Sequence, residues 1–220
     1  MQHYKLVIFD WDGTLMDSIA RIVSSMQAAA IQCYLQPPTD EQVKDIIGLS
    51  LPVGLSVLFP NNSKAQLDKM ITQYKYQYIH VDTTPTPLFE HAKSLLNALT
   101  HENKLLAVAT GKARQGLQRV FDMTETEHYF HASRCADEAN SKPDPQMILS
   151  LLEELGIQPE HAVMIGDTSH DMAMAQAAGI DRIGITLGVH DKKVLNSYQP
   201  NAVVDSLKEL QQLLIPEQKT

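Results

Sequence analysis

Two acidic residues stand close together near the start of the chain, in the segment Phe9-Asp-Trp-Asp-Gly-Thr-Leu15. Asp10 and Asp12 are two residues apart, so on an extended backbone their carboxylates point the same way. Two carboxylates about 4 Å apart repel each other by roughly 4 kcal/mol at an effective dielectric of 20. Such a pair needs a cation, a shared proton or a basic neighbour. Gly13 allows the backbone to turn sharply away after the pair.

Three later segments carry polar residues of the types that bind phosphate and metal: Ala109-Thr-Gly-Lys112, Ser141-Lys-Pro-Asp-Pro145 and Gly166-Asp-Thr-Ser-His-Asp171. The Thr110 hydroxyl and the Gly111 N–H, at a helix start, can bind an anion. Lys142 can offset the charge of a carboxylate and a phosphate, and the proline after it holds the chain extended. Asp167 follows an apolar run, and Asp171 lies one helical turn further on, on the same face. Each segment alone has an ordinary alternative: a strand ending in Thr-Gly, a surface lysine or a helix cap.

The charges of these segments together predict a metal ion. If Asp10, Asp167 and Asp171 meet a phosphate dianion, Lys142 offsets only one of the negative charges. The ligands are all oxygens, which select a hard cation. A few carboxylates, completed by water and substrate phosphate, suit Mg²⁺ better than Ca²⁺. A calcium loop starting at Asp10 is disfavoured, because Ile19-Ala-Arg21 stands where such a loop has its last ligands.

The elements that must position these residues are visible as short apolar runs. We predict buried parallel strands at Lys5–Phe9, Leu105–Ala109, Ala162–Ile165 and Arg182–Thr186, with a weaker candidate at Ala202–Val204. Apolar residues at three- and four-residue spacing predict helices at Ala113–Phe121, Pro145–Leu155, Ser169–Ala178 and Leu207–Leu214. Asp144 is expected to cap the helix that starts at Pro145, and Gly156 and Gly179 are expected at helix ends.

Strands that alternate with helices predict an α/β fold with a doubly wound, Rossmann-like parallel sheet. In such sheets ligands bind outside the carboxyl ends of the strands, so the four polar segments are expected to converge on one site.

Residues 17–84 do not show this alternation of strands and helices. Their pattern predicts consecutive helices, with capping-box patterns at Thr39-Asp-Glu-Gln42 and Ser63-Lys-Ala-Gln66. We therefore expect an α/β core formed by residues 1–16 and 85–220, and a small all-helical cap domain of residues 17–84 inserted after the first strand. The loop at Gly48-Leu-Ser50 is a candidate specificity loop, and Gly48 and Ser50 are candidate substrate-binding residues. The alternative is that Gly48 only ends the helix begun at Thr39.

Composition narrows the class of protein further. The 220 residues are 44% hydrophobic, enough for a substantial core, and carry a formal net charge of −8. No cluster of Lys and Arg offers a face for nucleic acid. The longest apolar stretches are far shorter than the roughly 18 residues of a membrane span, and the N-terminus lacks the pattern of a signal peptide. We therefore expect a soluble, cytoplasmic protein whose two cysteines are reduced.

The four segments, in this order, resemble the motifs of the haloacid dehalogenase-like hydrolase superfamily, and the helical insertion resembles the cap of its phosphoglycolate phosphatase-like branch. The resemblance implies a Mg²⁺-dependent phosphatase that acts on a small phosphorylated metabolite. It implies that Asp10 is the nucleophile and that Asp12 is the acid and base. Thr110, Gly111 and Lys142 would bind the phosphoryl group. The metal would be bound by Asp10, Asp167 and the Asp12 carbonyl, and Asp171 would support it directly or through water.

Alternatives remain open at this point. Haloacid dehalogenases lack an acid at the position of Asp12, and phosphonoacetaldehyde hydrolases need a cap lysine that the stretch Gly48–Gly54 lacks. β-Phosphoglucomutases place a phosphate-binding arginine near the same stretch, which also has none. A sugar-phosphate mutase or a pyrophosphatase stays possible, and so does a non-enzymatic receiver-like domain phosphorylated on aspartate. The sequence leaves open the physiological substrate and whether the chain is a monomer or a dimer.

Overall fold

The computed structural model describes residues 3–215 of the chain. Its centre is a sheet in which every neighbouring pair of strands is parallel. The strand order is β3-β2-β1-β4-β5-β6. The strands are β1 (Leu6–Phe9), β2 (Leu105–Ala109), β3 (Ala132–Arg134), β4 (Ala162–Gly166), β5 (Asp181–Ile185) and β6 (Ala202–Val204).

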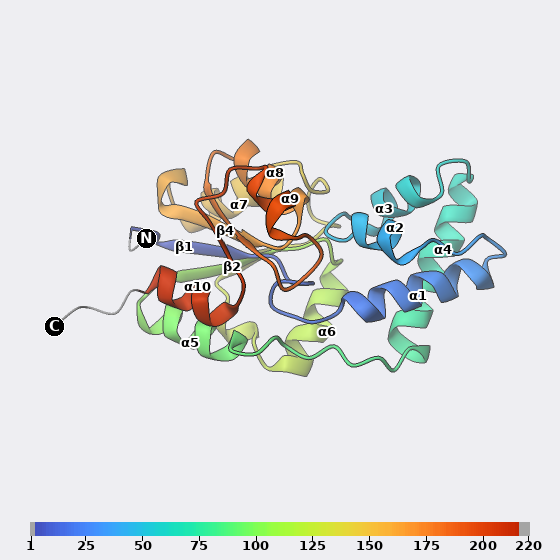
Figure 1. Cartoon of the computed structure of the whole chain (residues 1–220), viewed down its shortest axis with the longest axis horizontal. Helices are drawn as coiled ribbons and strands as arrows, with labels where there is room; N and C mark the ends of the chain where they lie inside the picture. The colour runs from blue at the N-terminus through green and yellow to red at the C-terminus, as the bar shows by residue number, and fades with distance from the viewer. Residues whose placement is uncertain (1–2, 216–220) are drawn as a thin grey trace.

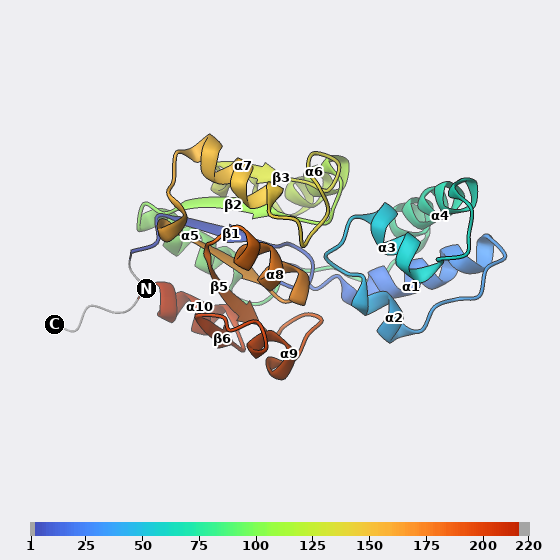
Figure 2. The same ribbon diagram turned by 90° about the horizontal axis from the view of Figure 1, so that it is seen from above.

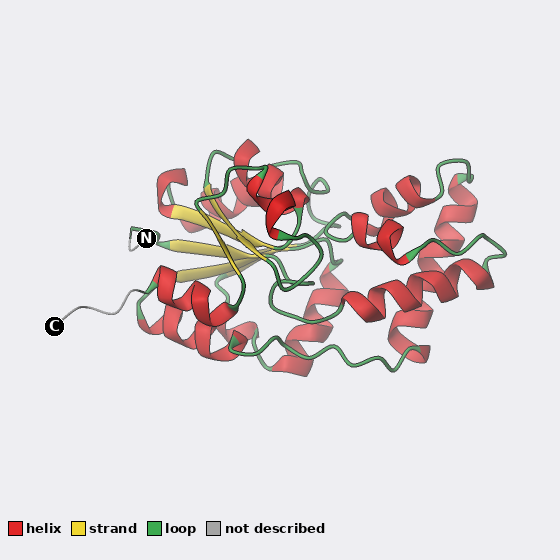
Figure 3. Ribbon diagram, in the orientation of Figure 1, coloured by secondary structure: helices red, strands yellow, loops and turns green. Residues whose placement is uncertain are grey.

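Helices cover both faces of the sheet, as Figures 1 and 3 show. On one face, α5 (Ala92–His101), α6 (Arg114–Thr124) and α10 (Leu207–Leu214) bury leucines against the strands. On the other face, α7 (Gln146–Leu155) and α8 (Ser169–Ala177) form a second apolar layer. The short helix α9 (Lys192–Asn196) and the 3₁₀ turns Glu127–Tyr129 and Pro159–His161 complete the connections. Apolar residues on both faces explain why the strands read as continuous hydrophobic runs.

The order of the strands reverses between β1 and β4. From β1 the chain moves outward through β2 to β3, then returns to β4 on the other side of β1 and continues to β6. In open parallel sheets this switch point leaves a crevice at the carboxyl ends of the two central strands. Residues 10 and 167 therefore stand at the place where such folds bind their ligands.

A helical unit lies beside the sheet, at the carboxyl ends of its strands (Figures 1 and 2). It contains α1 (Ile19–Gln32), α2 (Asp40–Asp45), α3 (Leu51–Leu58), α4 (Lys64–Tyr76) and the π-helical turn η1 (Gln77–Val81). It has its own apolar core, which includes Met26, Leu55 and Met70. Both predicted capping boxes are present, at the starts of α2 and α4. The structure is thus the predicted doubly wound α/β fold with a helical cap.

The chain enters and leaves the helical unit through two neighbouring segments. Met16 and Leu88 form an antiparallel bridge. The Asp17 N–H donates to the Pro87 carbonyl at 2.8 Å, and the Phe89 N–H donates to the Leu15 carbonyl at 2.9 Å. The two connections are therefore a short ribbon and not two independent strands of chain.

Several details differ from the sequence prediction. The helix expected to start at Pro145 starts at Gln146, because the Asp144 carboxylate accepts a hydrogen bond from the Gln146 N–H and Pro145 is the cap residue. The strand β3 and the helices α5 and α9 were not predicted individually. β3 is a three-residue edge strand whose side chains are all half-buried, so it lacks the apolar signal of the other strands. Among the described residues, no helix has the length and apolarity that a membrane span requires.

Candidate active site

Three buried carboxylates meet at the switch point of the sheet. Asp10 follows β1, Asp167 follows β4, and Asp171 lies in the first turn of α8. One oxygen from each lies within 4.8 Å of the others, and all three residues are buried. The Asp10 N–H donates to the Ile165 carbonyl at 2.9 Å, which extends the β1–β4 pairing to Asp10. The convergence expected from the motif order is therefore present in the fold.

Lys142 is the cation of this cluster. Its Nζ donates to Asp10 Oδ1 at 2.7 Å and to Asp171 Oδ1 at 2.6 Å, and its side chain is fully buried. The ordinary alternative, a surface lysine, is wrong. One ammonium thus bridges two of the three carboxylates.

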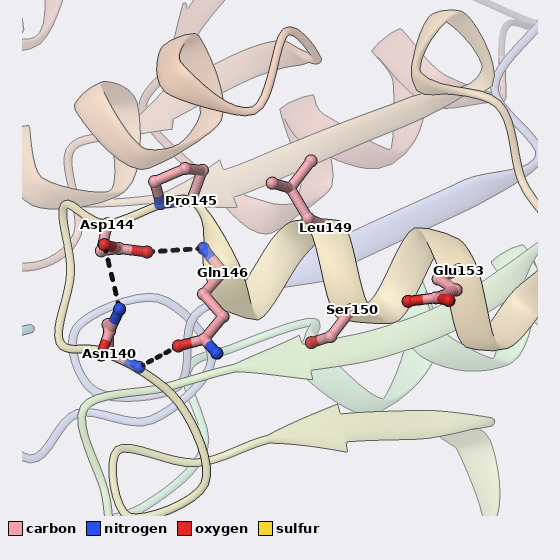
Figure 4. Close-up of a pocket in the computed structure, with 7 residues that line it drawn as sticks. All are labelled: Asn140, Asp144, Pro145, Gln146, Leu149, Ser150 and Glu153. Atoms are coloured by element: carbon pink, nitrogen blue, oxygen red, sulfur yellow. Dashed lines mark hydrogen bonds between the residues drawn. The ribbon is translucent and has the colours of Figure 1, made fainter.

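The loop that carries Lys142 is fixed at both ends. Figure 4 shows the Asn140 N–H bonded to the Gln146 side chain, and the Asp144 carboxylate accepting from the Asn140 amide and the Gln146 N–H. The surface pocket in the same view is lined by residues of this loop and of α7. It includes none of the three buried carboxylates, so it is separate from the cluster.

Asp171 also serves as a helix cap. Its Oδ2 accepts from the Thr168 N–H at 3.1 Å and from the Thr168 hydroxyl at 2.6 Å, while Thr168 Oγ1 accepts from the Asp171 N–H at 3.2 Å. The helix-cap interpretation of Asp171 is thus confirmed, and the residue also lies in the buried acidic cluster. Each Asp171 oxygen already has a partner within the protein.

Asp167 is held by residues that the sequence did not single out. Its Oδ1 accepts from the Thr14 hydroxyl at 2.9 Å, and its Oδ2 accepts from the Val189 N–H at 2.8 Å. A Cβ at Gly188 would lie 1.9 Å from Asp167 Oδ2, and one at Gly13 would lie 2.3 Å from it, so both positions require glycine. The signal for the loop of Gly188 and Val189 was its place after β5, at the same sheet edge as the four motifs.

The second oxygen of Asp10 has no partner. Asp10 Oδ2 is buried and accepts no hydrogen bond within the described residues. A buried carboxylate oxygen without a partner costs free energy of about 1–3 kcal/mol or more. An oxygen-only set of three carboxylates with an unfilled acceptor fits a hard divalent cation. Asp10, Asp167 and Asp171 are the residues that could hold it.

Burial affects the pKa values of Asp10, Asp167 and Lys142. Burial raises the pKa of Asp10 to about 7, against the opposing effect of Lys142. Burial, and then the charges of Asp10 and Asp171, raise the pKa of Asp167 well above its usual range. Burial alone would lower the pKa of Lys142, but the two carboxylates outweigh it and raise that pKa. Without a metal, one ammonium therefore does not offset the cost of ionising both Asp10 and Asp167 in this buried site.

Asp12 faces a different set of groups. Its Oδ1 accepts from the Ser18 hydroxyl and lies 2.9 Å from Lys112 Nζ. Its carboxylate is absent from the group formed by the other three acids. Ser18 and Lys112 were not assigned a role from the sequence. The two acids of the first motif thus occupy two distinct environments.

Thr110 and Gly111 follow β2 beneath the cap. Thr110 is fully buried, and its hydroxyl oxygen accepts from the Lys112 N–H at 3.2 Å. A Cβ at Gly111 would lie 2.6 Å from the Leu49 carbonyl oxygen and 2.7 Å from that of Gly48. Glycine at this position is therefore required for the cap loop to approach the core backbone.

The loop at Gly48-Leu-Ser50 packs on the motif segments of the core. The Ser50 N–H donates to Ser141 Oγ at 2.8 Å, and His170 Nε2 lies 3.1 Å from the Asp45 carbonyl oxygen. The alternative that Gly48 only ends the helix begun at Thr39 is wrong: α2 ends at Asp45, with Ile46 as its cap. Gly48 has a φ of +96° and turns the loop toward Thr168.

Comparisons with known proteins agree with this geometry. The family model described as haloacid dehalogenase-like hydrolase matches residues 7–185. The protein named Probable phosphatase IndB, from Dickeya dadantii (strain 3937), is 30% identical over 93% of this chain and 91% of its own length. The pyrophosphatase PpaX of Bacillus cereus (strain B4264) is 28% identical over 94% and 95%.

A solved structure gives the same fold. The structure described as a haloacid dehalogenase-like hydrolase from Bacteroides fragilis superposes with a TM-score of 0.87 at 24% identity, covering 94% of this chain and 99% of that one. Since the family model spans most of the chain, including all four motifs, the protein belongs to the haloacid dehalogenase-like hydrolases and is a phosphatase of that family.

Proposed function

We propose that the protein hydrolyses small phosphate monoesters with the help of Mg²⁺, by transferring the phosphoryl group to Asp10. The observation that carries the proposal is the state of Asp10. One of its oxygens is bound by Lys142 at 2.7 Å, and the other is buried without a partner in a cluster of carboxylates. In a carboxylate placed in this way, one oxygen is held in position by Lys142 and the other is free to react. That arrangement suits covalent catalysis, which splits a slow hydrolysis into two easier steps.

The first step forms a bond between an Asp10 oxygen and phosphorus and breaks the bond to the leaving oxygen. Asp12 gives its proton to that oxygen, so the leaving group departs as an alcohol. Asp12 then takes a proton from water, whose oxygen attacks phosphorus and releases phosphate and free Asp10. Ser18 and Lys112 hold the Asp12 carboxylate in place for both transfers. The Thr110 hydroxyl and the Gly111 N–H are proposed to bind the phosphoryl oxygens, and Lys142 to bridge them to Asp10.

The metal ligands are proposed to be Asp10, Asp167 and the Asp12 carbonyl. When bound, Mg²⁺ neutralises charge on the phosphoryl oxygens. Both oxygens of Asp171 already accept hydrogen bonds, from Lys142 and Thr168, so we assign Asp171 an indirect role in supporting the metal. Thr14 and the Val189 N–H orient Asp167.

We propose that residues 17–84 act as a lid on a core formed by residues 1–16 and 85–220. Support comes from the loop at Gly48-Leu-Ser50, whose carbonyl oxygens lie over Gly111 and whose Ser50 N–H binds Ser141. A closed lid excludes bulk water from the phosphorylated aspartate. Gly48 and Ser50 lie next to the proposed phosphate-binding residues, and we propose that they contact substrate.

Pyrophosphate hydrolysis is the second candidate, because several relatives along nearly the whole chain are named pyrophosphatases. The mutase alternative gains no support from the cap loop, which has no arginine between Gly48 and Gly54. Membership of a hydrolase family removes the receiver-like alternative. The substrate is thus proposed to be a small phosphate compound. The four motifs could act on a phosphate ester or on a phosphate anhydride.

Removal of divalent metal is expected to abolish activity. The carboxylates of the cluster carry more negative charge than Lys142 offsets, and a phosphate dianion adds to it. Protein dialysed against EDTA should not release phosphate from p-nitrophenyl phosphate, and Mg²⁺ should restore the rate while K⁺ does not. Full activity without any divalent ion would contradict the metal assignment.

The metal-free protein is expected to lose stability as the pH rises. Because the pKa of Asp10 is raised from 3.8 to about 7, folding favours its protonated form. This stabilisation is present below the unfolded-state pKa and is lost as the pH rises through about 7. In EDTA we expect Tm to fall by about 5 °C between pH 5.5 and pH 8, relative to Asp10→Asn as the control. Mg²⁺ should remove most of the fall. An equal pH dependence in both proteins would contradict the role of Asp10.

A further inference from the structure

A cluster of three cations surrounds one tyrosine ring where the cap meets the core. Arg21 Cζ lies 5.0 Å from the centre of the Tyr78 ring, Lys112 Nζ lies 5.4 Å from it, and Arg119 Cζ lies 5.2 Å from it. Arg21 is on α1 and Tyr78 is on η1, whereas Lys112 follows β2 and Arg119 is on α6. We call Arg21, Lys112 and Arg119 the cation cluster. It is assembled from both parts of the chain.

The cation cluster contains polar groups without partners. Arg21 Nε, Arg119 Nε and the Tyr78 hydroxyl oxygen are buried and make no hydrogen bond within the described part of the chain. The Arg119 guanidinium has no salt bridge there either. A buried donor without a partner costs about 1–3 kcal/mol. A cation over an aromatic ring recovers about 0.5–2 kcal/mol, and like charges crowded around one ring repel. The terminal nitrogens of Arg21 donate to the carbonyls of Asp82 and Thr84, which gives Arg21 a structural role, but these bonds leave its Nε and the Nε of Arg119 without an acceptor among the described residues.

The cation cluster adjoins the leaving-group side of the reaction. Lys112 Nζ, 5.4 Å from the Tyr78 ring centre, is also 2.9 Å from Asp12 Oδ1. Asp12 is the residue proposed to give its proton to the leaving oxygen. Lys142, by contrast, serves the phosphoryl side, through Asp10 and Asp171. The described site thus has one cation for the transferred group and three near the group that departs.

Tyr74 completes the surroundings of the cation cluster. Burial raises the pKa of its hydroxyl well above 10, with further contributions from Tyr78 and Asp12, against the opposing effect of Arg119 and Arg21. Tyr74 is therefore neutral at physiological pH and adds no negative charge. Asp12 forms a salt bridge with Lys112, whereas Arg21 and Arg119 form no salt bridge with any residue of the part of the chain that the structure describes.

Resting on the function proposed above, we infer that Arg21, Lys112 and Arg119 bind a second anionic group, carried by the leaving group of the substrate. The chemical class is a phosphate ester or anhydride whose leaving group is itself an acid, with a carboxylate or a second phosphate close to the scissile bond. The buried donors of Arg21 and Arg119 supply charge-assisted hydrogen bonds to such a group. Because the cluster is shared between cap and core, the second anion also joins the two parts when the lid is closed.

Selectivity for the leaving group tests this inference. We compare kcat/KM for phosphoglycolate and pyrophosphate, whose leaving groups are anionic, with kcat/KM for p-nitrophenyl phosphate. Loss of one charge-assisted hydrogen bond corresponds to a decrease in kcat/KM of roughly 10–100-fold. We call kcat/KM for a substrate with an anionic leaving group, divided by kcat/KM for p-nitrophenyl phosphate, the selectivity ratio. In Arg119→Gln we expect this ratio to fall by at least about tenfold. Arg119→Lys should recover part of the ratio, because it restores the charge.

The matched control is Lys75→Gln on the exposed face of α4, which makes the same change in net charge outside the cation cluster. Its ratio should stay within about twofold of wild type, which is close to the error of such a comparison. A larger loss for phosphoglycolate than for pyrophosphate identifies a carboxylate, and the reverse identifies a phosphate. An unchanged ratio in Arg119→Gln, or an equal ratio change in Lys75→Gln, would overturn the inference.

A binding experiment separates this inference from the proposed function. In titration calorimetry with Mg²⁺, wild type should bind phosphonoacetate, which has a second acid, more tightly than methylphosphonate, which has none. Arg119→Gln should lose this difference. If no substrate is turned over but the difference in binding is present and is lost in Arg119→Gln, the proposed function fails and the anion site stands. If the two phosphonates bind wild type equally, the anion site is wrong.

Discussion

Asp10→Asn should lower the turnover of p-nitrophenyl phosphate by at least about 10³-fold while the protein remains folded, since removal of a nucleophile has costs of this order. The amide is nearly isosteric with the carboxylate but cannot attack phosphorus. It also removes a charge from a buried cluster in which Lys142 is the one ammonium bridging two acids. The variant should therefore be as stable as wild type, or more stable, in the absence of metal.

The control is Asp12→Asn, which removes the proposed acid and base but leaves the nucleophile. With p-nitrophenyl phosphate, whose leaving group needs little protonation, this variant should form phosphorylated enzyme and hydrolyse it slowly. Acid-quenched samples analysed by intact mass should then show one added phosphoryl group in Asp12→Asn and none in Asp10→Asn. Turnover by Asp10→Asn within tenfold of wild type would rule out covalent catalysis through this residue.

Lys142→Met should destabilise the metal-free protein by about 3–5 kcal/mol, the usual effect of leaving a buried charge without its partner. Lys142 Nζ is the hydrogen-bond donor to one oxygen of Asp10 and to one of Asp171, and all three side chains are buried. Methionine fills a similar volume without the charge, so the loss reports electrostatics more than packing. Urea unfolding in EDTA measures it.

A second variant separates the electrostatic cause of the lost stability from a packing cause. Lys142→Met combined with Asp10→Asn removes one positive and one negative charge, so it should recover part of the lost stability but no activity. If Lys142→Met alone cost less than about 1 kcal/mol, in the range of a surface ion pair, the bridging lysine would not be the counter-ion of the site.

Much of the site could be predicted because its reactive residues lie in short sequence motifs next to recognisable strands. Asp10, Thr110 and Asp167 each follow a strand that is recognisable as a buried apolar run, and parallel strands bring their carboxyl ends to one edge. Lys142 could be predicted as functional from its motif, but not its bridge to Asp171. That contact depends on where the loop before α7 places Lys142 relative to the first turn of α8.

The rest depends on parts of the chain that meet only in the folded protein. Gly188 and Val189 hold Asp167 from a loop about twenty residues further along, and nothing in that loop resembles a catalytic motif. Tyr78 and Arg119 lie on separate helices and contact each other only in the folded protein. The periodic pattern of each helix explains its own residue and gives no sign of this contact. Propensity and spacing describe one element at a time, so the contact between Tyr78 of the cap and Arg119 of the core could not be predicted from them. The edge strand β3 was missed for a simpler reason, its lack of buried side chains.

The ribbon formed by Met16 and Leu88 has a consequence for how such a protein can change over time. Residues opposite each other in an antiparallel pair have Cα atoms about 4.5–5.5 Å apart. The insertion therefore begins and ends at nearly the same point, and the pairing of Asp17 with Pro87 closes the core beneath it. Any folded segment with neighbouring ends, or a short turn, could occupy that point without displacing β1 or α5. Replacing the insertion would then change the cap residues Arg21 and Tyr78 near the departing group, while Lys112, Arg119 and the residues proposed to break the phosphate bond stay in the core.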